Sequence, residues 1–149
     1  ANVLQRNIYS LNIKTKKRTL LDNGKGVHQA KLSEDGLWLV DTWQEPDVPR
    51  ACAVTNTKTG KSTLLQTAPN PWEGWYQPIF ESGSVKAEDG VTDLYWRMVK
   101  PADFDPNKKY PTVVYVYGGP HAHSIEASWH WASRSWETYM AQKGYLLFI

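Results

Sequence analysis

The sequence predicts a mixed α/β fold that is mostly β-structure, with antiparallel sheets first and one main helix later. Three features predict it: a repeated hairpin sequence before residue 66, a proline-rich break at residues 67–75, and a strand–helix–strand pattern after residue 111. The break also predicts a division into two parts, residues 1–75 and residues 76–149.

The repeat joins two segments that lie 44 residues apart. Asn12–Leu21 and Asn56–Leu65 agree at seven of ten positions, and each follows a short strand-like run. Both copies have turn residues followed by an extended Thr-Leu-Leu, so each predicts a β-hairpin. Between them, Asp35-Gly36 is a turn sequence that joins two further extended runs.

Four strands repeating every 40 to 45 residues or so are typical of a β-propeller blade. We expect one complete blade at about residues 27–66, preceded by half of another. The alternative is a chance similarity between hairpins of a small β-sandwich. Blades need neighbours to cover both faces, so the pattern predicts that the chain is a piece of a larger protein.

The second part begins with a predicted hairpin, whose strands lie at residues 78–86 and 92–99 around a turn at 87–90. A polar loop follows at 101–111. Residues 112–117 are almost all apolar, as expected of a strand that is covered on both faces.

One helix is predicted, from about residue 129 to 143, with Gly144 as its C-terminal cap. Its expected apolar stripe consists of Trp129, Ala132, Trp136, Tyr139 and Met140. Residues 145–149 form a buried-strand sequence, which completes a β–α–β crossover. This last strand is expected to leave an open, association-prone sheet edge, because the α/β sheet is incomplete.

Composition excludes several kinds of partner and site. The formal charge is only +2 and the basic residues are scattered, so no nucleic-acid partner is expected. The single cysteine, Cys52, excludes an internal disulfide and is expected to be a small buried hydrophobe. No signal peptide is visible in the first residues, which says nothing about secretion if the chain is a fragment.

Histidines are the remaining candidates for a metal site. His121, His123 and His130 lie near one another in the sequence, but a zinc site needs three or four ligands on a rigid frame. We therefore expect loop and packing roles for them, and no metal. His28 begins a strand and is expected to be a hydrogen-bonded residue in the core or between blades.

The most informative motif is Tyr117-Gly118-Gly119-Pro120, which ends the apolar run. A strand that stops on two glycines lets another group approach its backbone closely, and hydrolases hold an oxyanion at such turns. A tyrosine hydroxyl there can donate to the oxygen of a tetrahedral intermediate. The alternative is that Tyr117 is an aromatic that packs under a loop.

This motif does not stand alone. Upstream of it, in the expected order, come Leu-Tyr-Trp-Arg-Met at 94–98, Pro-Ala-Asp-Phe-Asp-Pro at 101–106 and Lys-Lys-Tyr-Pro at 108–111. Together they resemble the dipeptidyl peptidase IV branch of the prolyl oligopeptidase family of serine peptidases. In that branch the tyrosine before the glycine turn lends its hydroxyl to the oxyanion hole.

The resemblance implies the end of a β-propeller followed by the N-terminal part of an α/β-hydrolase domain. It implies an enzyme that releases N-terminal dipeptides, often after proline, through a serine acyl-enzyme. It also implies peptide substrates, no cofactor, a homodimer, and a secreted or periplasmic setting. Tyr117 would be the catalytic residue of this segment, and Gly118, Gly119 and Pro120 would form the turn that presents it.

The rest of that machinery is missing from the sequence. It contains no Gly-x-Ser-x-Gly nucleophile motif, and the family's aspartate and histidine would come later in the chain. We therefore expect the 149-residue chain to be inactive by itself. Two alternatives stay open: a non-catalytic propeller-type binding module, and an oligopeptidase or acylaminoacyl peptidase of the same family.

Overall fold

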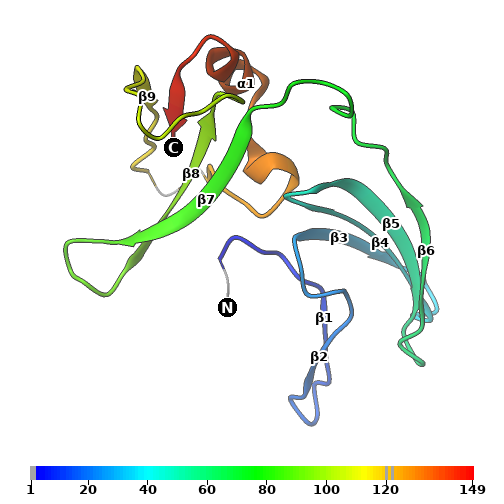
Figure 1. Ribbon diagram of the computed structural model, residues 1–149. Coiled ribbons are helices and arrows are strands. Elements are labelled where there is room, and N and C mark those ends of the chain that lie inside the picture. The colour runs from blue at the N-terminus through cyan, green and yellow to red at the C-terminus, as the bar shows by residue number, and fades with distance from the viewer. Residues whose placement is uncertain (1–2, 120, 122) are drawn as a thin grey trace. The chain divides into compact units, whose positions relative to one another are not determined.

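The structure is a computed structural model that describes residues 3–119, 121 and 123–149. Strands dominate it, as predicted (Figure 1). The described residues group into two compact units. The first unit holds the chain up to Pro71 together with Glu126–Trp129, and the second holds Trp72–Ile125 together with His130–Ile149.

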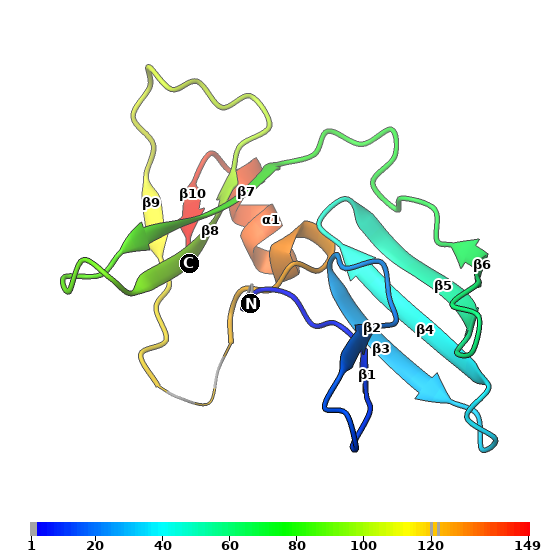
Figure 2. The same cartoon turned by 90° about the horizontal axis from the view of Figure 1, so that it is seen from below.

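A four-stranded antiparallel sheet forms most of the first unit (Figures 1 and 2). Its strands follow the order of the chain: β3 (Val27–Leu32), β4 (Trp38–Glu45), β5 (Val48–Asn56) and β6 (Ser62–Thr67). The four strands predicted for residues 27–66 are therefore present, with the Asp35-Gly36 turn between the first two. A separate hairpin precedes them, made of β1 (Tyr9–Leu11) and β2 (Arg18–Leu20).

The sequence repeat has a geometric counterpart in two equivalent turns. Asn12 Oδ1 accepts hydrogen bonds from the backbone amides of Lys14 and Thr15, at 3.0 Å each. Asn56 Oδ1 accepts the equivalent hydrogen bonds from Lys58 and Thr59, also at 3.0 Å each. The fifth residue of each turn has a positive φ, 59° at Lys16 and 71° at Gly60. The first copy therefore holds a lysine in a conformation that favours glycine.

His28 is fully buried in the sheet, as predicted. Its Nδ1 lies 2.7 Å from Asp41 Oδ2 and its Nε2 lies 2.6 Å from the backbone oxygen of Lys25. The ring also stacks on Trp43, with 5.6 Å between ring centroids. Cys52 is only half-buried, contrary to expectation, because it points to the opposite face of β5 from the position of buried Ala51 and Ala53.

The second unit contains a mixed four-stranded sheet. Its order is β7 (Ile79–Lys86), β8 (Asp93–Lys100), β10 (Leu146–Phe148) and β9 (Thr112–Val114). β7 and β8 form the predicted hairpin, whereas β10 runs parallel to β9. The predicted β–α–β crossover is thus present between β9 and β10.

The position of the last strand corrects two predictions. β10 lies between β8 and β9, so it is an interior strand and not the open edge that the sequence predicted. The edge position belongs to β9, where Thr112 and Val114 are exposed instead of covered on both faces. β10 pairs with β8 on one side and with β9 on the other, so it separates these two strands.

The helix is shorter than predicted. α1 spans Ser135–Gln142, and the preceding Trp129–Ala132 form a separate tight turn, η1. His130, Trp131 and Ala132 have φ values of 49°, 57° and 65°, which are incompatible with a right-handed helix. Gly144 does cap α1, since its amide donates to Ala141 and the next amide donates to Met140. No helix in the described part of the chain is long and apolar enough to span a membrane.

The buried face of α1 also differs from the predicted stripe. Trp136 and Tyr139 are 38% and 57% exposed, whereas the buried residues are Glu137, Thr138 and Ala141. Ala141 packs with Val99 and Leu147 in the core of this unit. Glu137 forms a buried ion pair with Arg97 of β8, which accounts for the rotation of this face toward the sheet.

Candidate functional site

The predicted site begins where β9 leaves its partner. The backbone amide of Tyr115 donates to Phe148 at 2.9 Å, which extends the β9–β10 pairing one residue past the strand. Val116 and Tyr117 then diverge from the sheet and are 77% and 47% exposed. The predicted strand 112–117 therefore ends early, and Tyr117 stands beyond its carboxyl end.

Gly119 is the residue that gives the Tyr117 side chain its place. A Cβ on Gly119 would lie 2.8 Å from the Tyr117 hydroxyl oxygen and 2.9 Å from ring carbons Cε1 and Cζ. The phenol thus folds back over a backbone that only glycine leaves open. Among the described residues other than its two chain neighbours, none has an atom within 4 Å of a Cβ built on Gly118. Pro120, the last residue of the predicted turn, lies outside the described residues.

Tyr117 borders a pocket of about 470 Å³ in the second unit. Most of its lining is aromatic or aliphatic, contributed by β7 and β8, by the segment 115–117, by residues 123–125 and by the end of the chain. The Tyr117 hydroxyl is therefore a hydrogen-bond donor at the margin of an apolar surface. The lining residues are Val85, Asp93, Leu94, Tyr95, Trp96, Tyr115, Val116, Tyr117, His123, Ser124, Ile125, Phe148 and Ile149.

A buried ion pair lies beneath this region. Arg97 of β8 and Glu137 of α1 are 1% and 0% exposed. The Arg97 guanidinium binds the Glu137 carboxylate through two parallel contacts: Nη1 to Oε2, and Nη2 to Oε1 at 2.8 Å. Such a two-point pair fixes both side chains in orientation as well as in position.

The same pair holds two backbone segments. Arg97 Nε donates to the carbonyl of Ser124 at 3.2 Å, and Ser124 lines the pocket that Tyr117 borders. Glu137 Oε2 accepts the backbone amide of Arg134 at 3.0 Å, so it also caps the start of α1. One buried pair thereby joins β8, α1 and the pocket-lining segment around Ser124.

The position of Arg97 in its strand is a sequence signal for this buried pair. Residues of a strand alternate between faces, so Arg97 shares a face with Val99, which is 1% exposed. An arginine on the core face of a strand needs a buried acceptor. The partner could not be identified from the helix pattern, because the predicted stripe placed Glu137 on the outer face.

In the part of the chain that the structure describes, no group of three or more His, Cys, Asp or Glu side chains could hold a metal ion. His130 instead stacks on Phe80, with 3.9 Å between ring centroids. Its burial lowers its pKa from 6.5 to about 4, since the charged imidazolium loses hydration there.

The geometry offers part of a catalytic arrangement. A tyrosine hydroxyl beyond a strand end, beside an apolar pocket, can donate a hydrogen bond to a developing oxyanion. The sequence supplies no nucleophile elbow to place beside it. Cleavage chemistry would therefore need residues that this chain does not contain.

Known proteins share this combination of sequence and fold. No family model matches the chain. The chain is 30% identical to dipeptidyl peptidase 4 of Trichophyton rubrum over 132 residues, which cover 84% of the chain. It also superposes on the crystal structure of a Bacteroides ovatus protein assigned as a dipeptidyl aminopeptidase IV, with a TM-score of 0.86 and 42% identity over 94% of the chain.

This chain is a dipeptidyl peptidase IV-like segment. The crystal structure of Porphyromonas gingivalis dipeptidyl peptidase 4 matches it as well, with a TM-score of 0.80 and 25% identity over 97% of the chain. The likeness therefore extends through both compact units of the dipeptidyl peptidase IV-like segment. The segment spans 17% of the length of the Trichophyton relative and 20% of each of the two bacterial structures.

Proposed function

We propose that the complete protein to which this segment corresponds is a serine peptidase that removes dipeptides from the N-termini of polypeptides, often after proline. The observation that carries the proposal is the 42% identity to the Bacteroides ovatus protein over 94% of the chain. Residues 1–75 would be the last part of its propeller and residues 76–149 the first part of its hydrolase domain. Its partners would be peptide substrates and a second copy of itself.

Within that enzyme, the Tyr117 hydroxyl would be an oxyanion-hole donor. The phenol would donate a hydrogen bond to the carbonyl oxygen as negative charge develops on it during attack by the serine. Gly119 supports this role because it leaves room for the folded-back ring. Gly118 and Pro120 would complete the turn.

The first test replaces Tyr117 by Phe in the complete enzyme, which removes the hydroxyl and keeps the ring. We expect kcat on an X-Pro chromogenic substrate to fall about 10²–10³-fold, with little change in KM, because the donor acts in the transition state. Retention of more than about a third of the wild-type kcat would contradict the role of Tyr117.

A matched pair of glycine variants tests the positioning. Gly119→Ala places a methyl group 2.8–2.9 Å from the Tyr117 phenol and should displace it. Gly118→Ala places its methyl group where no atom of the described residues, chain neighbours aside, lies within 4 Å. We expect Gly119→Ala to lower kcat at least about tenfold and Gly118→Ala to have a smaller effect. Equal effects of the two variants would exclude a specific role for the space at Gly119.

Substrate class is tested separately. The complete enzyme should cleave an X-Pro peptide with a free N-terminus and should not cleave the same peptide after N-acetylation. Preference for the acetylated peptide would instead favour an acylaminoacyl peptidase. The isolated 149-residue chain should show no cleavage of either peptide.

A further inference from the structure

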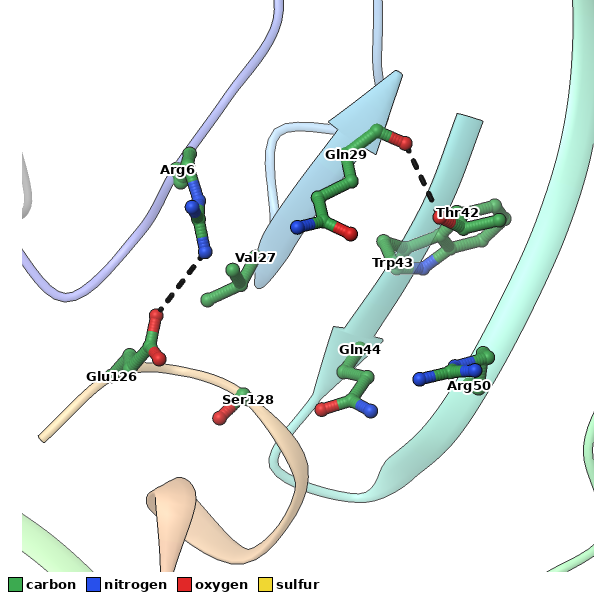
Figure 3. A pocket seen from close by; sticks show the side chains of 9 residues that line it. All are labelled: Arg6, Val27, Gln29, Thr42, Trp43, Gln44, Arg50, Glu126 and Ser128. Carbon is green, nitrogen blue, oxygen red and sulfur yellow. Dashed lines mark hydrogen bonds and ion pairs between the residues drawn. The ribbon is translucent and has the colours of Figure 1, made fainter. Parts of the chain in front are cut away.

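A second pocket lies within the first unit, bordered by β3, β4 and β5 (Figure 3). It has a volume of about 260 Å³. Backbone hydrogen bonds hold its walls: the amide of His28 donates to Arg6 at 2.9 Å, and the amide of Ala127 donates to Leu4 at 2.7 Å. Its lining residues are Arg6, Val27, Gln29, Thr42, Trp43, Gln44, Arg50, Glu126 and Ser128.

The pocket carries one uncompensated positive charge. Arg6 Nη2 lies 3.5 Å from Glu126 Oε2, so these two charges offset each other. Figure 3 shows Arg50 across the pocket from this pair, with its guanidinium directed toward Gln44. Within the described part of the chain, Arg50 has no acidic partner. An anion in the pocket would therefore meet a free guanidinium.

Neutral donors accompany that charge. The side chains of Gln29, Gln44 and Ser128 line the pocket and make no hydrogen bond to another described residue. Ser128 is nevertheless only 9% exposed. Gln29 is exposed and Gln44 is half-buried, so a ligand in the pocket would replace water at these two side chains. The two amides can each donate to and accept from an amide group.

We propose that this pocket binds a carboxylate of about amino-acid size. A carboxylate matches the planar fork of Arg50, which can donate two parallel hydrogen bonds to it. Its single negative charge balances the single excess charge of the pocket. The volume is below the range of about 300–1,000 Å³ typical of drug-sized ligands, so the ligand is small. Gln29 and Gln44 hold an amide of the ligand next to its carboxylate.

Titration of the protein with N-acetylglycine, which combines an amide with a carboxylate, tests the proposal. Two-dimensional NMR of the Gln29 and Gln44 side-chain amides follows binding at the pocket itself. We expect saturable shifts with a dissociation constant in the millimolar range or tighter. The neutral analogue N-acetylglycinamide should bind at least about tenfold more weakly, because it lacks the charge that Arg50 binds.

Variants separate this site from general charge attraction. Arg50→Gln should weaken N-acetylglycine binding about tenfold or more, and Gln44→Leu should weaken it as well. Lys31→Gln is the control: the substitution removes the same charge as Arg50→Gln, but Lys31 is exposed on β3 and does not line the pocket. Absence of saturable shifts, equal binding of the two acetylglycine compounds, or unchanged binding by Arg50→Gln would overturn the proposal. Tighter binding of inorganic phosphate would overturn the carboxylate assignment.

Discussion

Replacement of Glu137 by Gln tests whether the buried pair with Arg97 holds the second unit together. Glutamine keeps the shape of the side chain but removes its charge, which leaves the Arg97 guanidinium buried without a counter-ion. Glu137 accepts three hydrogen bonds, two from Arg97 and one from the Arg134 amide, and it is 0% exposed. Removing one partner of a buried ion pair costs about 3–5 kcal/mol of unfolding free energy.

That cost is large beside the roughly 5–15 kcal/mol that separates most folded domains from the unfolded state. Urea denaturation followed by circular dichroism measures it as a shift of the midpoint at constant slope. Asp93→Asn is the matched control, because the Lys86–Asp93 pair is solvent-exposed at 55% and 42%. We expect the control to lose at most about 1 kcal/mol.

The double variant Arg97→Met/Glu137→Leu completes the experiment. It removes both charges and should recover much of the stability that Glu137→Gln loses, because no unpaired charge stays buried. A loss below about 1 kcal/mol for Glu137→Gln would refute the reasoning. So would a double variant less stable than the single one, since the deficit would then not come from an unpaired charge.

Two further predictions concern backbone strain and pH. Lys16→Gly should stabilise the chain by about 0.5–1 kcal/mol and Gly60→Lys should destabilise it by about 1 kcal/mol, because both positions have a positive φ. Thermal unfolding measures both changes in stability, and changes of the same sign would contradict the equivalence of the two turns. His130 has a pKa of about 4 in the fold and 6.5 ordinarily, so the unfolded chain binds the proton first and stability falls as pH drops from 6.5 toward 4. His130→Asn should reduce the loss of unfolding free energy between pH 7 and pH 4.5 by about 2–3 kcal/mol, as measured by urea titrations. An unchanged pH profile would show that burial of His130 does not cause this loss of stability.

Local patterns in the sequence were sufficient for much of the fold. The Asn-x-Lys-Thr repeat predicted two hairpins because the asparagine oxygen and the residue with positive φ act within one turn. Gly144 predicted the end of α1 because its capping hydrogen bond also forms within one turn of the chain. The Tyr117 turn could be predicted as a candidate site because its residues are contiguous and part of a longer set of motifs.

The tertiary structure decided what depends on residues far apart in the chain. The insertion of β10 between β8 and β9, the choice of Glu137 for the buried face of α1, and the grouping of Arg6, Arg50 and Glu126 around one pocket all join distant segments. Hydrophobic periodicity considers only the apolar character of residues, so it placed Trp136 on the inner face of the helix. It could not predict that Arg97, 40 residues upstream, would bind the Glu137 carboxylate in the core. Short-range conformational preferences depend on neighbouring residues. Strand pairing and burial depend on which distant residue pairs with each buried charge and which distant strand pairs with each open strand edge.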